Sequence, residues 1–509
     1  MMMDLIGALP MLCLVLGAIC LLVIDLCGLS LGRLYWLGVL CICGLSWMCS
    51  TYFLFNLEDA RELLLNSDGV IPPAKLMALS QIRSVAPVLG GFYYPDSFSF
   101  ALNTILLLGL FLSLLMTRGQ LSRQGVEDST DVDVLMILAT VGGMIMVGAA
   151  DLIALFLGFE LLSISVYVLS GLARKERASS EGALKYFLLG AFSSAFLLYG
   201  MVLVYGEVGS MQLAEIGANA ASASQLFWVG FALIAFGFAF KIGAVPFQFW
   251  VPDVYQGAPT SLTAFMAVVV KASAFGAFLR LVALGFSEGA MHWNGLVWAL
   301  SILTMTIGNL LAIRQQSLKR MLAYSSIAHA GYALMGFLAI GKDRGAEAIV
   351  FYLFAYALMT IASFGVALVS GNASRLQYQR DDIKSLSGLG WSSPALALVM
   401  SIAMLSLAGM PPLAGFMGKF FIFSSALSAG YTGLVIVAAL NSVASLYYYL
   451  RVILVMYFGD REEGLVWDEG QTTPSLRFAL GVAAFGILIV GIFSDSFVRF
   501  AQLAAKSLG

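Results

Sequence analysis

The sequence predicts an all-α polytopic membrane protein folded as one membrane domain. Of its 509 residues, 60% are hydrophobic and only 11% are charged, and the mean hydropathy is +0.93. Soluble proteins carry about 25% charged residues, so a chain with so few charges must expose most of its surface to lipid. Its apolar segments are long enough to cross a bilayer, and the alternation typical of a β-barrel is absent.

A membrane-spanning helix needs about 20 mostly apolar residues, and about fourteen segments meet this criterion. Backbone groups in lipid must be paired within the segment, so we expect helices. The predicted spans are residues 5–26, 34–56, 97–117, 132–149, 152–172, 182–206, 225–250, 260–286, 293–313, 320–341, 345–371, 393–426, 430–457 and 476–499. The first is expected to be a retained helix rather than a signal sequence, because it lacks a basic leading region and runs into another apolar segment.

Lysine and arginine are unevenly divided between the two sides of the predicted bundle. Fourteen spans place both termini on one side, whose loops carry 7 of these residues, whereas the opposite loops carry 14. Cytoplasmic loops are the richer in positive charge. We therefore predict a multi-pass protein of the cell inner (cytoplasmic) membrane with both termini outside the cytoplasm.

Two predicted spans are interrupted by helix-breaking residues. Proline removes a backbone donor and opens a helix, and the breaks contain Gly243, Pro246 and Pro252 in the seventh span and Gly409, Pro411, Pro412 and Gly415 in the twelfth. Pro246 lies 114 residues after the start of the fourth span, and Pro411 lies 118 residues after the start of the ninth. Matched broken helices are typical of transporters with inverted repeats.

This register predicts how the single membrane domain, residues 1–509, is organised. We expect an N-terminal three-helix segment (1–117), a first five-helix repeat (132–286), a second, inverted five-helix repeat (293–457) and a C-terminal helix (476–499). An odd number of crossings in each repeat makes the second inverted relative to the first.

Four charged residues lie inside predicted spans or beside their breaks: Glu160, Lys241, Lys271 and Lys419. A charge at mid-membrane costs about 2.5–3.5 kcal/mol on insertion scales, so such residues usually mark a functional pathway. A static structural ion pair is the alternative, but three lysines cannot all pair with one glutamate. Burial disfavours the ammonium form of lysine and a nearby carboxylate favours it, which suits a proton relay.

The broken helices predict different environments for two of these lysines. Lys241 ends the first half of its helix, near the negative pole, which favours the ammonium form. Lys419 follows its break, and we expect it near the positive pole of the second half, where proton release is favoured.

Lys185 and His329 are possible further members of the relay. Lys185 lies four residues after Glu181, so an ordinary surface pair is an equal alternative. His329 has hydroxyl-bearing neighbours and can titrate near neutral pH, although a packing histidine is as good an interpretation. Arg280 and Arg451 lie near span ends, where long side chains are expected to reach the interface.

The chain contains no motif for nucleotide hydrolysis, dinucleotide binding or metal binding. There is no Walker loop, no GxGxxG fingerprint and no metal-ligand spacing, and the cysteines, all between residues 13 and 49, form no CxxC pair. The net charge of -2 argues against nucleic acid as a partner. We therefore expect no cofactor and no metal in this chain, with energy supplied by an ion gradient or by partner subunits.

Five segments closely resemble the antiporter-like membrane subunits of respiratory complex I, the proton-translocating NADH:quinone oxidoreductase. They are FLGFELLSISVYVLSG (156–171), KIGAVPFQFWVPDVYQGAPTSLTAF (241–265), KRMLAYSSIAHAGY (319–332), LSLAGMPPLAGFMGKFFIF (405–423) and SLYYYLRV (445–452). WVPDVYQGAP together with a lysine at 419 points to the subunit N branch of this family. The resemblance covers essentially residues 1–500.

The resemblance implies a fourteen-helix fold with two inverted repeats. It also implies that Glu160, Lys241, Lys271 and Lys419 are proton-transfer residues, with Lys185 and His329 as lesser members. Gln248 stands where relatives often carry histidine. The chain would be a non-redox subunit whose partners are other membrane-arm subunits. The NADH, flavin and iron–sulfur sites and most of the quinone site would lie in other subunits of the complex.

Three alternatives remain open at this point. A stand-alone cation/proton antiporter of the same ancestry would be active as a purified chain. The equivalent subunit of a hydrogenase or ferredoxin-linked complex would differ in the subunits with which it co-purifies. A purely structural spacer would not need buried lysines.

Overall fold

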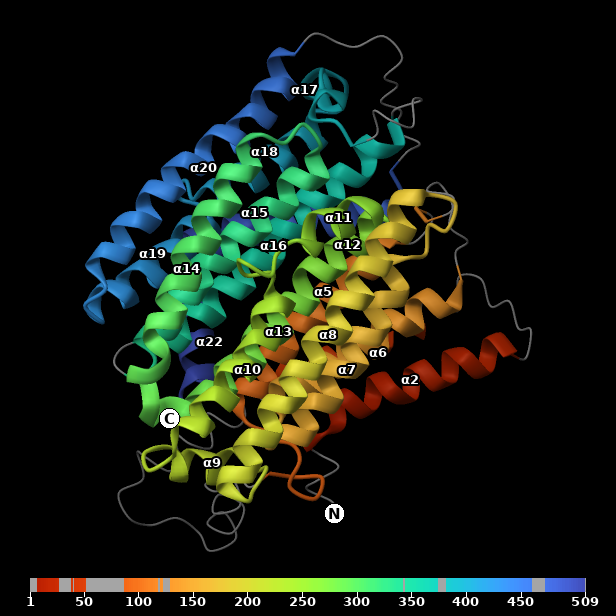
Figure 1. Ribbon diagram of the computed structural model, residues 1–509. Helices are drawn as coiled ribbons and strands as arrows, with labels where there is room; N and C mark the ends of the chain where they lie inside the picture. The colour runs from red at the N-terminus through yellow and green to blue at the C-terminus, as the bar shows by residue number, and fades with distance from the viewer. Residues whose placement is uncertain are drawn as a thin grey trace, which may run out of the picture.

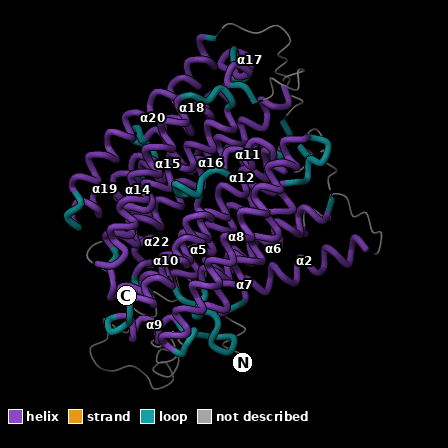
Figure 2. The backbone as a smooth tube through the Cα atoms, in the orientation of Figure 1, coloured by secondary structure: helices purple, strands orange, loops and turns teal. Residues whose placement is uncertain are grey.

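Long apolar helices lying side by side make up the described part of the chain (Figures 1 and 2). This computed structural model describes residues 7–26, 38–39, 41–51, 87–117, 120–121, 129–341, 344–373, 381–459 and 472–508. Within these ranges the regular structure is helical, and extended pairing is limited to isolated bridges such as Val88 with Tyr93. Most of the predicted 57–96 loop, and loop cations such as Arg33 and Arg61, lie outside the described residues.

Each of the predicted spans overlaps a helix. The longer helices are α2 (Leu9–Leu26), α5 (Ser97–Thr117), α6 (Thr130–Gly148), α7 (Leu152–Ser170), α8 (Arg177–Val208), α10 (Gln225–Ile242), α14 (Ala290–Ile313), α15 (Leu318–Met335), α16 (Gly345–Ala373), α18 (Pro394–Ala408), α19 (Ala414–Ser428), α20 (Thr432–Phe458) and α21 (Pro474–Ile492). Among the described residues, 9 helices are long and apolar enough to cross a membrane, and shorter apolar helices accompany them. The predicted all-helical, polytopic membrane fold is confirmed.

Shorter helices lie in the connections or divide predicted spans, and they account for differences from the predicted bounds. They are α9 (Leu213–Ala220), α11 (Trp250–Gly257), α12 (Thr260–Phe265), α13 (Lys271–Leu281), α17 (Leu389–Ser392) and α22 (Ser494–Ala505). The predicted 260–286 span is interrupted by π-helical turns at Met266–Val270 and Val282–Phe286 on either side of α13. The predicted 476–499 span ends early, because α21 stops at Ile492 and α22 begins a separate helix.

Both predicted helix breaks are present, and they are built alike. Gly243 (φ +74°) directly follows the last residue of α10, and Gly409 (φ +89°) directly follows that of α18; both have the left-handed conformation that glycine adopts without steric cost. Each break also contains a cis X-Pro peptide, Val245–Pro246 and Pro411–Pro412. Side chains satisfy backbone donors beside the breaks, as broken helices at membrane depth require: Thr304 Oγ1 accepts from the Val245 amide and Ser406 Oγ from the Gly415 amide, both at 3.0 Å.

Small residues let neighbouring helices approach closely, both between α6 and α7 and between α8 and α10. A Cβ placed on Gly158 of α7 would lie 2.7 Å from the carbonyl oxygen of Gly142 on α6. A Cβ on Gly200 of α8 would lie 2.5 Å from the carbonyl oxygen of Gly230 on α10. Without a hydrophobic drive between helices in lipid, such close backbone packing is a main source of association.

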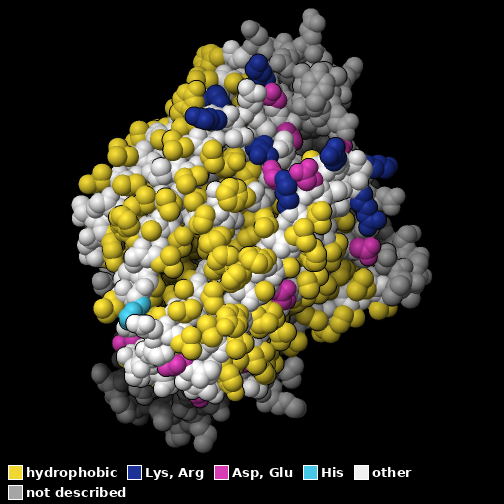
Figure 3. Space-filling model, in the orientation of Figure 1, with side chains coloured by type: hydrophobic (Ala, Val, Ile, Leu, Met, Phe, Trp, Pro, Cys, Tyr) yellow, Lys and Arg dark blue, Asp and Glu magenta, His cyan; other side chains and the backbone are white. Residues whose placement is uncertain are grey.

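The outer surface is apolar over most of its height. Figure 3 shows a broad band of hydrophobic side chains, with lysine and arginine gathered at the end where α11 and α17 lie in Figure 1. Large side chains such as Leu157, Leu188 and Val443 are exposed, as expected where the solvent is lipid. The short helix α9 lies at the opposite end (Figure 1).

Candidate functional site

Lys241 lies in the last turn of α10, directly before the first break, and is only 2% exposed. Its Nζ donates a hydrogen bond to Ser163 Oγ on α7 at 2.6 Å. The ring centroids of Phe159 and Tyr167, also on α7, lie 4.9 and 5.5 Å from Nζ. This buried lysine is therefore held by one hydroxyl and by the electron-rich faces of aromatic rings.

Glu160 is half-buried on the same helix, one turn before Ser163. Its Oε1 is buried and has no hydrogen-bond partner among the described residues. Residues i and i+3 share a helix face, so Lys241 binds the part of α7 that carries Glu160. The structure thus brings the two predicted residues to the same place, with Lys241 bonded to the hydroxyl rather than to the carboxylate.

Lys271 is the first residue of α13 and is 6% exposed. Its Nζ donates to both the main-chain carbonyl and the hydroxyl oxygen of Ser326 on α15. The ring of Tyr356, from α16, lies 5.2 Å from Nζ. Lys271 has no carboxylate partner among the described residues, so a static ion pair does not account for its burial.

A small cavity lies between Lys241 and Lys271. Its volume is ≈ 10 Å³, and its lining includes both lysines, Ser326 and Tyr255. A water molecule needs about 10–15 Å³ and several polar partners. The cavity therefore has about the size and the lining of a single water site between two buried ammonium groups.

His329 lies on α15, one turn after Ser326, and is 2% exposed. Its Nδ1 is hydrogen-bonded to the hydroxyl of Tyr352, and its Nε2 lies 3.1 Å from the hydroxyl of Tyr449. The Tyr449 hydroxyl also bonds Ser325. Both ring nitrogens of His329 therefore belong to a buried hydroxyl network.

Lys419, 4% exposed, lies on α19 after the second break. Its Nζ donates to the carbonyl oxygens of Leu407 (3.0 Å) and Ala408 (2.9 Å) and to Ser442 Oγ (2.9 Å). The prediction that it lies at the positive pole of α19 is wrong. Its side chain points back across the break to the last carbonyls of α18, which favour the ammonium form.

Aromatic side chains connect these groups in sequence. The ring of Tyr356 faces Lys271 Nζ, and its centroid is 5.4 Å from that of His329. On the other side, the Tyr332 centroid is 5.9 Å from His329 and 5.0 Å from Lys419 Nζ. The order through the interior is Lys241, the small cavity, Lys271, His329 and Lys419. Sequence reasoning noted the hydroxyl-bearing neighbours of His329 on its own helix but missed Tyr332, Tyr356 and Ser163, although Ser163 follows Glu160 at helical spacing.

Lys185 is apart from this interior line, with 44% of its side chain exposed. It pairs with Glu181, as the alternative interpretation predicted, and also with Asp253 of α11, both at 2.8 Å. Arg320 pairs with the second oxygen of Asp253 at 2.8 Å. Partial burial acts to raise the pKa of Asp253, but hydrogen bonds from Lys185 and Arg320 outweigh it and hold that pKa below the usual aspartate value.

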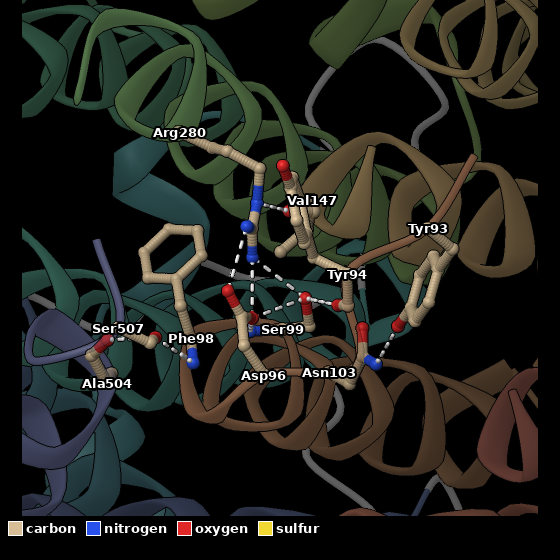
Figure 4. A network of polar contacts seen from close by, with 10 residues as sticks. All are labelled: Tyr93, Tyr94, Asp96, Phe98, Ser99, Asn103, Val147, Arg280, Ala504 and Ser507. Atoms are coloured by element: carbon tan, nitrogen blue, oxygen red, sulfur yellow. Dashed lines mark hydrogen bonds and ion pairs between the residues drawn. The ribbon is translucent and has the colours of Figure 1, made fainter. Parts of the chain in front are cut away.

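Arg280 contradicts the expectation that it reaches the interface. It is 1% exposed and forms two parallel hydrogen bonds with Asp96, from Nη1 to Oδ2 (2.9 Å) and from Nη2 to Oδ1 (2.7 Å) (Figure 4). Arg280 Nε also donates to the Val147 carbonyl, and Asp96 accepts from the Ser99 amide at the start of α5. The pair joins α5, α6 and α13 and was not apparent from sequence spacing.

Gln248 lies in the first break, 6% exposed, and its Oε1 has no hydrogen-bond partner in the described structure. No group of three or more His, Cys, Asp or Glu side chains in the described ranges is close enough to bind a metal ion. The chemistry that this arrangement offers is proton exchange among lysine, histidine, hydroxyls and enclosed water.

Comparison with known proteins identifies the family. Residues 149–445 match the family described as NADH:quinone oxidoreductase/Mrp antiporter, transmembrane. NADH-quinone oxidoreductase subunit N of Trichlorobacter lovleyi is 46% identical over 415 residues, covering 81% of this chain and 84% of the relative. This chain belongs to the subunit N family. The resemblance of the five sequence segments is therefore confirmed.

Solved structures agree with this assignment to the subunit N family. A chain of respiratory complex I from Thermus thermophilus is 30% identical, with a TM-score of 0.75 over 96% of this chain and 98% of that one. A chain of an archaeal membrane-bound sulfane sulfur reductase is 25% identical, with a TM-score of 0.84 over 99% and 97%. The antiporter-like fold is thus shared by different redox complexes.

Proposed function

We propose that this subunit N family member is a proton-translocating, non-redox subunit in the membrane arm of an NADH:quinone oxidoreductase. Electron transfer in partner subunits, which would hold the flavin, iron–sulfur clusters and quinone, drives proton movement through Glu160, Lys241, Lys271 and Lys419. Its partners are the neighbouring membrane-arm subunits and the lipid bilayer.

The observation that carries the proposal is the burial, along one polar line, of three lysines that bond no carboxylate in the described part of the chain. Lys241, Lys271 and Lys419 are each at most 6% exposed, and their Nζ atoms contact hydroxyls and carbonyl oxygens. Leaving a charge uncompensated in a dry interior is costly, so a packing role alone does not explain three of them. A lysine held by hydroxyls, unlike one in a strong ion pair, can give up its proton.

The proposed step begins at Glu160. When its carboxylate approaches Lys241, the ammonium form is favoured and a proton is held. When Glu160 moves away or becomes protonated, Lys241 releases its proton through the small cavity to Lys271. His329 and its tyrosine neighbours then connect Lys271 to Lys419. Each charge moved against 100 mV costs about 2.3 kcal/mol, which a change in one buried pairing is large enough to supply.

The domain arrangement and orientation form part of this proposal. Residues 132–286 and 293–457 would be the two inverted repeats, each with a broken helix, between the 1–117 segment and the C-terminal helix. Both termini would lie outside the cytoplasm.

Substitution of the first relay pair tests the proposal. Lys241→Ala and Glu160→Ala are each introduced into the intact complex, and NADH-driven proton uptake is measured in inverted membrane vesicles together with complex assembly. Both should impair pumping while the complex assembles, whereas Lys384→Ala, at an exposed lysine, should pump normally. Normal pumping by both relay variants contradicts the relay. Cation/proton exchange by the purified chain alone would favour the antiporter alternative.

A further inference from the structure

We propose that the stacked rings of Tyr186 and Trp250 form a gate between a surface crevice at Asp253 and the buried cavity that joins Lys241 to Lys271. The inference rests on the proposed function, because it assigns to these rings the control of access to that relay. It is carried by two cavities, a ring stack and two unpartnered polar groups.

The crevice lies on the outer surface beside the first helix break. Its volume is ≈ 550 Å³, and its lining includes Lys185, Gln248, Phe249, Trp250, Asp253 and Arg320. The remaining lining is mostly apolar, but Lys185, Asp253 and Arg320 form the ion-paired network described above, and charged groups of this kind can exchange protons with water at the opening.

Trp250 separates the surface crevice from the buried cavity. It lines the crevice, and together with Tyr186 it lines the buried cavity that contains Lys241 and Lys271. Lys185 and Tyr186 are consecutive residues of α8, yet Lys185 lines the crevice and Tyr186 lines the cavity. The partition between the surface and the relay is therefore about one aromatic layer thick at this point.

The two rings close this layer. Their centroids are 4.1 Å apart with an interplanar angle of 9°, and Tyr186 and Trp250 are 0% and 3% exposed. The faces of stacked rings offer no hydrogen-bond path, so a proton cannot cross until the rings separate.

The two rings are held to different degrees. Trp250 Nε1 donates to the Phe240 carbonyl oxygen at 3.0 Å, which fixes the indole to the end of α10. The buried hydroxyl of Tyr186 has no hydrogen-bond partner among the described residues, and its ring is held by packing on Tyr167 (centroids 4.8 Å apart) and by Lys241 Nζ, 5.7 Å from its centroid. Tyr186 has no hydrogen bond to break when it moves, so it is the ring that moves and Trp250 is the fixed one.

Residues with unpartnered polar atoms line both spaces. Gln248 lines the crevice and Tyr186 lines the cavity, and neither Gln248 Oε1 nor Tyr186 Oη, both buried, has a hydrogen-bond partner among the described residues. Buried polar groups in native proteins are normally satisfied by protein or by water. Water reaching both atoms would satisfy them, and it would form a continuous path when the rings part.

Cysteine accessibility in the intact complex tests the gate. Val251 lines the buried cavity and is 3% exposed, and Val251→Cys is made in a chain whose native cysteines are replaced by alanine. The rate of modification by 2-aminoethyl methanethiosulfonate is measured without NADH, from the loss of later maleimide labelling. Trp250→Ala should raise this rate at least about tenfold, equivalent to a barrier lower by about 1.4 kcal/mol.

Matched variants complete the test. Phe249→Ala alters the neighbouring residue, which lines only the crevice, and should leave the rate unchanged, as should Trp250→Phe, which keeps a stacking ring. Tyr186→Ala should raise the rate as Trp250→Ala does, provided that both complexes assemble. Rates equal to the parent in both alanine variants overturn the gate. Because labelling needs no electron transfer, this failure is distinct from normal pumping by Lys241→Ala, which would overturn the relay.

Discussion

Lys419 and Ala408 face each other across the second helix break, with Lys419 Nζ 2.9 Å from the Ala408 carbonyl oxygen. Ala408 is the last residue of α18, and the last carbonyls of a helix have no partner within it. A lysine from the second half-helix therefore caps the first half. The same ammonium both holds the break together and, in our proposal, ends the line of relay groups.

Lys419→Met should remove both roles. We expect NADH-driven proton pumping to be lost and the thermal midpoint of the complex to fall, with a cost of about 1–2 kcal/mol for the lost charge at a helix C-terminus. Ser442→Ala is the control, because it removes one acceptor and leaves the cap to Leu407 and Ala408 intact. Equal effects of the two substitutions would show that the cap does not matter.

His329 should be required for transfer between Lys271 and Lys419. His329→Gln keeps a polar side chain among Tyr352 and Tyr449 but cannot exchange a proton at neutral pH. We expect pumping at roughly a tenth of the parent rate or less, since a positioned acid–base group contributes about 10²–10⁴-fold. Tyr449→Phe, which removes the hydroxyl shared by Ser325 and His329, should give an intermediate rate. Unchanged pumping in His329→Gln would restore the packing interpretation.

The Arg280–Asp96 pair should be a structural element rather than part of the relay. Asp96→Leu leaves a buried guanidinium unpaired, and we expect a loss of about 3–5 kcal/mol, seen as a large fall in thermal midpoint and poor assembly. The double variant Asp96→Leu/Arg280→Met removes both charges and should recover most of the loss. If the double variant is no more stable than Asp96→Leu, the two residues are not coupled.

Close packing of α6 against α7 should be sensitive to a single methyl group. A Cβ on Gly142 would lie 2.6 Å from the Leu162 amide nitrogen and 2.8 Å from the Gly158 carbonyl oxygen. Gly142→Ala should therefore cost about 1–3 kcal/mol of stability, seen as a lower thermal midpoint, and should shift the helix that carries Glu160. Gly206→Ala, at a helical glycine with open space around it, should be neutral or stabilising. The same response at both positions would rule out a packing effect.

The spans and the breaks could be predicted because each depends on a local property of the chain. Twenty apolar residues must form a helix in lipid, and a proline beside a glycine must interrupt one. Lys241 and Lys271 stand out for the same reason, since a charge in an apolar segment is visible without knowledge of its neighbours.

Partners distant in sequence could not be predicted. Arg280 pairs with Asp96, which is 184 residues away in the sequence. Arg280 lies near the end of a predicted span, so the sequence alone indicated a side chain that reaches the membrane surface. Lys419 was misplaced for a different reason. Helical side chains tilt toward the N-terminus of their helix, so a long side chain early in α19 reaches back to α18, whereas the prediction used only the position of its backbone.

The π-helical turns on either side of α13 determine the direction in which its buried charges point. Each such turn accommodates one residue more than an α-helical turn, and one residue corresponds to a rotation of about 100° around the helix axis. Deleting a residue from Met266–Val270 would swing Lys271 away from Ser326, and Arg280 would turn with it. The number of residues in these turns therefore sets the rotation of α13 about its own axis. A substitution, which leaves that number unchanged, could not correct the rotation that a deletion causes.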